Sequence, residues 1–414
     1  MQRCTTFILF YFLAACSGTS ETSPFCVDGR LAPSVFVVGC QKCGTTSLVA
    51  DMLSQLPLTC GSTLPGEPRK LWKEKHFFDN GECKFNRAAC YNESNSVAPA
   101  AGFNAARAHF LSHYPKCSAA APFPAGAAAM DATPRYMRVP MVPHRIRALY
   151  GPELSNKLKI VVILRDPETR AWSWFRFFAL NACEGKLWAT DQLERRFWFH
   201  YNDGSFGRWV QAQVDKLAEC SSRGLAQKGM WPHCDSETGL FAGLYSLQIR
   251  HWIAAGFDPS QFVVIPMDCY VSKGPALSMR AIGEAANLAV GTDLPALDKR
   301  FKHENSKRLR QISGGGGKAA AANRHGEKPM PLRATKVLRT FFKREREEME
   351  NLVLEYPTMR VIDCDMPHFF KQCNSTTCLP SFSESMSILD SAIEASVANG
   401  TIKEPGPVFG VNWR

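Results

Sequence analysis

Three kinds of pattern are missing from this 414-residue sequence, and each absence narrows the possible classes of protein. Beyond its first residues, no apolar run is long enough to cross a bilayer, so we do not expect a protein with several membrane spans. No segment repeats, which argues against solenoids and propellers. No DNA- or RNA-binding motif is present, so a nucleic-acid partner is not expected.

Acidic residues are outnumbered: 38 Asp and Glu face 49 Lys and Arg, which gives a formal net charge of +11. This excess favours a polyanionic partner such as a multiply charged nucleotide, although an inert basic surface would carry the same charge. The apolar fraction of 45% is typical of a globular protein, and the length suits one large domain or two ordinary ones.

The first 18 residues predict a signal peptide, with a basic start at Arg3, an apolar centre and small residues after it. The alternative is an uncleaved signal anchor, and membrane attachment is expected only in that case. Sixteen cysteines fit an oxidising compartment of the secretory pathway. Short loops could be closed by Cys83 with Cys90 and by Cys373 with Cys378, and glycosylation sequons begin at Asn92, Asn374 and Asn399.

The most informative stretch is residues 35–48, which predicts a buried strand, a tight loop and the start of a helix. Val35 to Val38 form an apolar, partly β-branched run, and apolar residues follow a helical period from Leu48 onwards. A glycine-containing loop before a helix directs backbone N–H groups and the positive end of the helix dipole at one point. We therefore expect this loop to bind a phosphate or sulfate group.

The place of the lysine in this loop distinguishes two kinds of anion site. ATP- and GTP-binding loops have a lysine directly after the second glycine, but here Thr45 follows Gly44 and the lysine is Lys42. The order Gly-x-x-Lys-x-Gly-Thr-Thr resembles the phosphosulfate loop of sulfotransferases, which use 3′-phosphoadenosine 5′-phosphosulfate (PAPS) and no metal. The resemblance implies that the donor is bound by Gln41, Lys42, Cys43, Gly44, Thr45, Thr46 and Ser47.

A second motif, Glu-x-His-Phe-Phe-Asp, occupies residues 74–79. It resembles the acceptor-side motif of heparan sulfate 3-O-sulfotransferases. By that resemblance Glu74 is the general base, while His76 and Asp79 orient the acceptor and the base. Taken alone, the string suits a half-buried strand end equally well, with Glu74 as a structural partner of a neighbouring lysine or arginine.

Residues 130–136 match another family motif only in part. Carbohydrate sulfotransferases usually have Glu-Lys-Thr-Pro-Ser-Tyr there, and Thr133, Pro134 and Tyr136 agree with it. Ala132 stands in place of the lysine, so that cation is either missing or supplied from elsewhere, for example by Arg135.

Residues 158–173 predict a second buried strand followed by a helix that begins near Asp166 and Pro167. The string Arg-Asp-Pro-x-x-Arg-Ala-x-Ser resembles the sulfotransferase site for the 3′-phosphate of PAPS. Arg165 would supply a bidentate fork and Ser173 a hydroxyl donor. The alternative is a helix cap with a salt bridge.

The remaining stretches carry weaker signals. Residues 181–236 hold aromatic and arginine side chains, Trp209 among them, that suit sugar contacts, although aromatic residues are more often core. The stretch from Gly243 to Trp252 predicts a structural helix packed on the sheet, before a strand at residues 261–265. The basic, Gly-Ala-rich residues 299–331 correspond to the family's nucleotide-covering loop, with Lys318 and Arg324 as candidate donor contacts.

The motifs occur in family order from about Val35 to Tyr356, and the chain resembles carbohydrate sulfotransferases of the heparan and chondroitin sulfate type. The resemblance implies an α/β fold with a P-loop-kinase-like central parallel sheet flanked by helices. It implies a single domain at residues 30–364, followed by a loop-rich tail at residues 365–414.

The same resemblance implies a reaction. A sulfonyl group moves in line from PAPS to a hydroxyl or amino group of an acidic, glycosaminoglycan-like polysaccharide in the Golgi lumen, while Lys42 stabilises the leaving phosphate and Glu74 takes the proton. The alternatives are a sulfotransferase for protein tyrosine, lipid or small molecules, a P-loop kinase, and a non-catalytic glycan-binding relative.

Overall fold

The computed structural model describes residues 25–62, 73–79, 103–117, 126–183, 203–222, 239–290 and 330–363. Several predictions fall outside these residues and stay predictions. They concern the signal peptide, the two short cysteine pairs, the sequons, most of the aromatic insertion, Lys318, Arg324 and the C-terminal tail.

The core of the molecule is a six-stranded sheet in which every neighbouring pair of strands is parallel. β6 shows why: it is a continuous apolar and β-branched run, buried on both faces, as parallel strands between helical layers are. The strands, in spatial order, are β4 (Leu58–Thr59), β5 (Ala128–Asp131), β3 (Pro33–Gly39), β6 (Lys159–Leu164), β7 (Phe262–Pro266) and β8 (Arg360–Val361). A separate antiparallel pair joins β1 (Cys26–Val27) to β2 (Arg30–Leu31).

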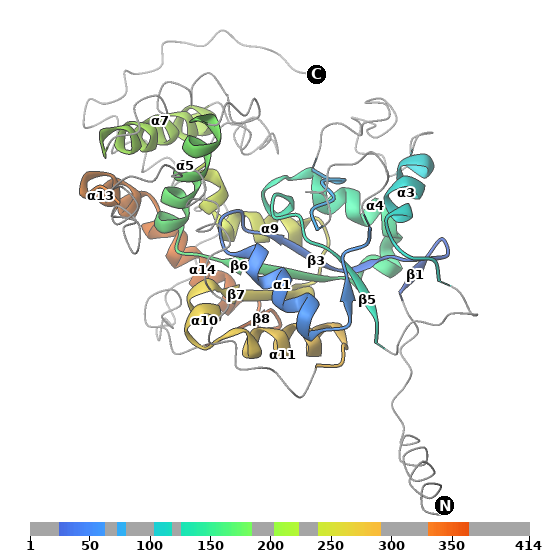
Figure 1. The fold of residues 1–414 in the computed structure, drawn as a ribbon. Helices are drawn as coiled ribbons and strands as arrows, with labels where there is room; N and C mark the ends of the chain where they lie inside the picture. Colours follow the sequence, from blue (N-terminus) through green and yellow to red (C-terminus); the bar gives the residue numbers. More distant parts are fainter. Residues whose placement is uncertain are drawn as a thin grey trace, which may run out of the picture.

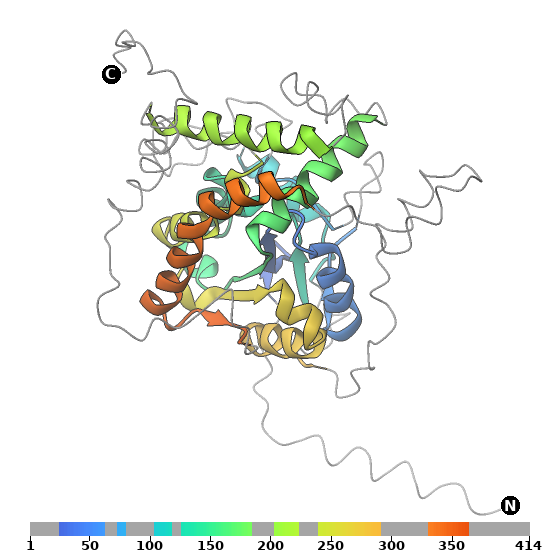
Figure 2. The same ribbon diagram turned by 90° about the vertical axis from the view of Figure 1, so that its left-hand side faces the viewer.

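Helices cover both faces of the sheet (Figures 1 and 2). On one face, α1 packs against α11, and on the opposite face α9 packs against α14. These helices and their neighbours are α1 (Thr45–Gln55), α3 (Phe103–Ser112), α4 (Met141–Ser155), α9 (Tyr245–Ala254), α10 (Met267–Ser272), α11 (Pro275–Ala286) and α14 (Lys343–Glu355). The predicted apolar stripe of α1 is confirmed, because Leu48, Val49 and Met52 are buried.

A second hydrophobic cluster lies beyond the carboxyl end of β6, where α5 (Pro167–Cys183), α7 (Asp203–Ser222) and α13 (Leu332–Phe341) pack together (Figure 1). Phe206 and Trp209 belong to this core, and the Trp209 side chain is only 1% exposed. Of the two interpretations of these aromatic residues, the core one holds for Trp209, because its ring packs between the helices.

β3 lies at the point where the direction of winding changes. After β3 the chain forms β4 and then β5 on one side, with β5 next to β3, and later returns to add β6 on the other side. In open α/β sheets, ligands bind outside the carboxyl ends of the strands at such a point. The loops that follow β3, β5 and β6 therefore define the edge where a site is expected, and each of them carries one of the sequence motifs. Within the described residues no helix has the length and apolar character needed to span a membrane.

Candidate functional site

The loop between β3 and α1 has the shape of an anion-binding loop. Lys42 and Gly44 both have left-handed backbones, with φ of 70° and 88°, and α1 begins directly afterwards at Thr45. The first N–H groups of a helix have no partner inside it, so they are available to an anion. Thr45 is buried whereas Thr46 and Ser47 are exposed, and a disulfide joins Cys40 to Cys43 across the loop. The Cys43 side chain is thus engaged, which leaves its backbone as the possible contact with a ligand.

Three cationic side chains gather beside this loop. The Lys42 ammonium lies 4.0 Å from the centroid of the Phe177 ring, and Arg165 Nη1 lies 3.5 Å from the Lys42 carbonyl oxygen. Burial, and then the positive charges of Arg165 and Arg176, lower the pKa of Lys42 to about 8. Neighbouring cations repel one another and so disfavour the charged form of each side chain. A bound polyanion relieves this repulsion and stabilises the charged forms. The sequence motifs did not include Arg176; its position one turn after Ser173 on α5 is the only local signal for it.

Arg165 and its neighbours take separate roles at the end of β6. The backbone N–H of Thr169 donates to Asp166 Oδ1 at 2.9 Å, which confirms the predicted helix start. Arg165 Nε donates to Thr169 Oγ1 at 3.1 Å, and its guanidinium faces the Lys42 carbonyl. Ser173 is partly exposed further along α5. The helix cap and the salt bridge of the alternative interpretation both exist, and Asp166 forms them, the bridge with Arg346 Nη2 at 3.1 Å; Arg165 faces the loop instead.

The structure brings together the three predicted acceptor-side residues. His76 Nδ1 lies 2.9 Å from Asp79 Oδ2, and His76 Nε2 lies 3.2 Å from Glu74 Oε2. Burial favours the neutral imidazole, but both carboxylates outweigh it and raise the pKa of His76 to about 9. Burial would also raise the pKa of Glu74, yet hydrogen bonds and charges from His76 and Lys73 hold it below its usual range. At neutral pH Glu74 is therefore a carboxylate and His76 an imidazolium.

The cation nearest to Glu74 is the ammonium of Lys73, 2.5 Å from Glu74 Oε1. The Lys73 carbonyl accepts a hydrogen bond from Ala132 N at 3.0 Å, so this lysine lies next to the position where the family's lysine is replaced. Arg135, the predicted substitute, is 4.0 Å from Asp79 instead of facing Glu74. A structural pairing of Glu74 with a neighbouring lysine therefore exists, and it places a positive charge beside the proposed base.

A buried network after β5 supports the backbone of this segment. Asp131 is fully buried and accepts hydrogen bonds from the hydroxyls of Thr133 and Tyr136, each at 2.7 Å. The same hydroxyl oxygens accept bonds from the backbone N–H groups of residues 76–78, at 3.1 to 3.4 Å. These bonds hold His76 in a left-handed conformation with φ of 51°. The partly matching motif at residues 130–136 thus positions the motif at residues 74–79, a link that the sequence did not reveal.

Tyr245 connects the two halves of the proposed donor site. Its hydroxyl donates to the carbonyl oxygen of Arg165 at 2.8 Å and lies 3.6 and 3.9 Å from the sulfur atoms of Cys40 and Cys43. The sequence predicted only a structural role for the start of this helix. Contact with both motifs places Tyr245 at the site.

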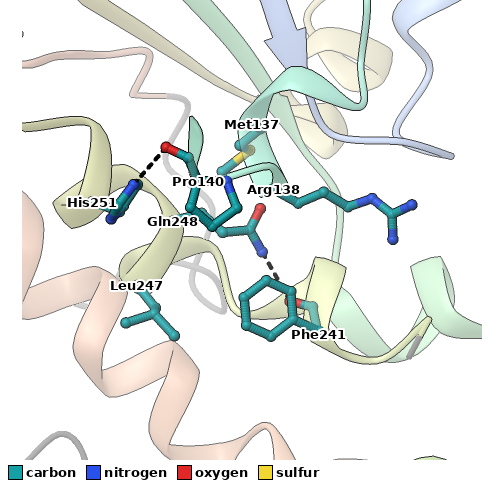
Figure 3. A pocket seen from close by; sticks show the side chains of 7 residues that line it. All are labelled: Met137, Arg138, Pro140, Phe241, Leu247, Gln248 and His251. Atoms are coloured by element: carbon teal, nitrogen blue, oxygen red, sulfur yellow. Dashed lines mark hydrogen bonds between the residues drawn. The ribbon is translucent and has the colours of Figure 1, made fainter. Parts of the chain in front are cut away.

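The pocket in Figure 3 lies elsewhere, between η2 (Tyr136–Arg138) and the start of α9. Two of its polar side chains are already paired, because Gln248 donates to the Phe241 carbonyl and His251 contacts the Pro140 carbonyl, both at 2.8 Å, and the Arg138 guanidinium lies over the Trp174 ring, 5.1 Å from its centroid. None of the predicted site residues lines it. We therefore assign no role in catalysis to this pocket.

The donor set at the site suits a phosphate-bearing nucleotide. The loop cations supply the charge for the phosphates, while Gln41 Oε1, buried without a hydrogen-bond partner in the described part of the chain, can accept a hydrogen bond from a ligand N–H or O–H group. Across the described ranges, no group of three or more His, Cys, Asp or Glu side chains is arranged to bind a metal ion.

Comparison with known proteins gives the class of enzyme. Residues 32–219 match the model of the sulfotransferase domain, a range that includes the donor loop, the Glu74 cluster and Arg165. The match confirms the prediction of a sulfotransferase, an enzyme that transfers a sulfonyl group, and the observed sheet agrees with the predicted α/β fold.

The other comparisons add less. No curated protein matches the sequence. The chain is similar to a solved sulfotransferase from Alicyclobacillus acidocaldarius, with 16% identity and a TM-score of 0.43, over 78% of this chain and 96% of that chain. A likeness this distant supports no statement about the substrate.

Proposed function

We propose that the protein transfers the sulfonyl group of PAPS to a hydroxyl or amino group of a carbohydrate, an acidic polysaccharide of the glycosaminoglycan type. The observation that carries the proposal is the juxtaposition at one sheet edge. The cationic loop after β3 has Arg165 on one side, after β6, and the carboxylate cluster supported by the strand end of β5 on the other. Sulfotransferases of this family generally use PAPS, and a cation cluster beside a helix N-terminus suits its phosphates.

The donor-side residues bind and neutralise charge. Lys42 would stabilise the negative charge that develops on the leaving phosphate, and the N–H groups at the start of α1 would bind the phosphosulfate oxygens. Arg165 and Ser173 would bind the 3′-phosphate, which distinguishes PAPS from ATP. Most of the rate acceleration would then come from positioning and electrostatics, as in phosphoryl transfer.

The acceptor-side residues handle the proton. Glu74 would accept it from the acceptor hydroxyl as the new S–O bond forms. His76, bonded to Glu74 and Asp79, fixes the orientation of the carboxylate. Lys73 shares Glu74, so the incoming hydroxyl would compete with this ammonium for a carboxylate oxygen. The basic net charge of +11 supports an acidic acceptor, since it favours encounter with a polyanion.

The test is a labelled-sulfate transfer assay across acceptors. Heparan-type and chondroitin-type polysaccharides should be sulfated, while a tyrosine peptide, a lipid and a small phenol should not. Preference for one of the last three would replace the carbohydrate proposal with the corresponding alternative. No transfer to any acceptor, with nucleotide binding intact, would favour a non-catalytic glycan-binding relative.

Replacing Glu74 with glutamine keeps the shape and removes the base, so the transfer rate should fall about 10²- to 10⁴-fold with nucleotide affinity retained. Glu153→Gln is the matched control, because Glu153 is exposed on α4, which leads to the amino end of β6 at the opposite sheet edge. A loss of less than about tenfold in folded Glu74→Gln protein would show that another residue is the base.

A further inference from the structure

The donor loop contains a feature that the proposed reaction does not use, namely the disulfide between Cys40 and Cys43. The bridge closes a small ring around Gln41 and Lys42. Both cysteine side chains are buried, at 2% and 0% exposure, whereas the two residues between them are partly exposed. The Cys-x-x-Cys spacing is the one that redox-active cysteine pairs use.

We propose that Cys40 and Cys43 form a redox-responsive site, and that the disulfide form is the state that binds the sulfonyl donor tightly. The inference rests on the proposed role of this loop as the donor site. A dithiol would reduce the pair by exchange: the Cys40–Cys43 bond breaks, each sulfur gains one electron and one proton, and the dithiol is oxidised to its own disulfide.

The first reason is the backbone conformation of Lys42. Its φ of 70° is left-handed, which is unfavourable for a residue with a side chain. The bridge restricts the residues around it to this turn. Once the bridge opens, Lys42 is free to return to a right-handed conformation, which would redirect its ammonium and the N–H group of the next residue. Donor binding would then have to restore the turn and order two residues, and this lowers the affinity.

The second reason is the contact with Tyr245. Both sulfur atoms lie within 4 Å of the Tyr245 hydroxyl, which donates to the Arg165 carbonyl. Reduction replaces a covalent bond with a longer non-bonded contact and adds two S–H groups beside that hydroxyl. Tyr245 is fully buried, and a close-packed interior accommodates such an expansion only by shifting its neighbours. The loop and Arg165, at the two ends of the proposed donor site, would therefore respond together.

The chain offers a matched control in its second described disulfide. Cys26 and Cys117 join β1 to the segment after α3, at a distance of 91 residues in the sequence. β1 and β2 lead directly into the amino end of β3, whereas the donor loop follows its carboxyl end. The Cys26–Cys117 bridge and the donor loop therefore lie at opposite ends of β3 (Figure 1). Opening it should leave the loop unchanged.

The experiment measures the affinity for adenosine 3′,5′-bisphosphate by calorimetry on the full chain, equilibrated in mixtures of reduced and oxidised dithiothreitol of graded potential. Alkylation and mass spectrometry report which cysteines are reduced in each sample. The affinity should fall about tenfold as Cys40 and Cys43 become reduced. Cys40→Ala/Cys43→Ala should bind weakly in every buffer, and Cys26→Ala/Cys117→Ala should keep the full redox response.

The wild-type titration decides the matter even if a variant does not fold. Unchanged affinity in protein whose Cys40 and Cys43 are both reduced would overturn the proposal. A Cys40–Cys43 bridge that stays closed where Cys26–Cys117 is fully reduced would also overturn it. Absence of bisphosphate binding in both redox states would instead refute the donor site, and with it the proposed function.

Discussion

Donor binding should be coupled to protonation of Lys42. In the ligand-free protein, burial and the charges of Arg165 and Arg176 lower the pKa of this lysine to about 8. A bound polyanion neutralises those charges and should return the pKa towards its ordinary 10.5. Binding should therefore take up about 0.1 proton at pH 7, about half a proton at pH 8 and about 0.9 at pH 9.

The sign of the effect follows from the direction of the shift. Below pH 8 the free lysine is already charged and the affinity is highest; above pH 8 binding must first charge it. Between pH 7 and pH 9 the affinity should fall about tenfold, or about 1.4 kcal/mol. Proton uptake is measured by calorimetry with adenosine 3′,5′-bisphosphate in buffers of different ionisation enthalpy.

The control is Lys42→Arg, whose guanidinium stays charged throughout this range. The pH dependence should disappear in the variant, which also corrects for titration of the ligand's own phosphates. Equal affinity of the wild type at pH 7 and pH 9, with no net proton uptake, would refute the assignment of Lys42 to the donor.

Two further predictions concern Arg165, beside this lysine, and Tyr136, in the network after β5. Arg165→Ala should weaken nucleotide binding by about 2–4 kcal/mol, and Arg165→Lys should recover only part of this loss, because lysine lacks the bidentate fork of arginine. The control in the same calorimetric titration is Lys157→Ala, since Lys157 is exposed just before the amino end of β6. An equal loss of affinity in Lys157→Ala would contradict the assignment of Arg165. Tyr136→Phe removes the hydroxyl that joins Asp131 to the backbone N–H groups of Phe77 and Phe78, so it should lower the unfolding free energy by about 1–3 kcal/mol and reduce kcat at unchanged nucleotide affinity. Denaturant unfolding and steady-state kinetics check both effects, and an unaltered kcat would show that the network is structural only.

Local sequence signals were sufficient for the elements that flank the proposed donor site. β3, β6 and α5 begin or end within one or two residues of the predicted bounds, because continuous apolar runs and the Asp166 cap are local features. The spacing of Lys42 and Gly44 likewise predicted the loop that the structure contains.

Contacts between distant segments could not be predicted in the same way. Tyr245 reaches Arg165 across 80 residues, and Tyr136 reaches the backbone near His76 across about 60. Arg176 joins the cation cluster only because α5 is directed back over the loop after β3. The sequence gives the residue types of such contacts, but the packing of strands and helices decides which of them meet.

The order of the strands sets the spacing between the two halves of the proposed site. β5, whose end supports the carboxylate cluster, is the direct hydrogen-bonded neighbour of β3, whose end opens the donor loop. Adjacent strands are separated by about 4.8 Å, a spacing that backbone hydrogen bonds fix and side chains hardly alter. Under the proposed function, loops and insertions at this end of the sheet can change the acceptor while the spacing between the loop after β3 and the Glu74 cluster stays constant. In the proposed reaction the backbone of the sheet fixes this spacing, so acceptor specificity can change without a change in the spacing.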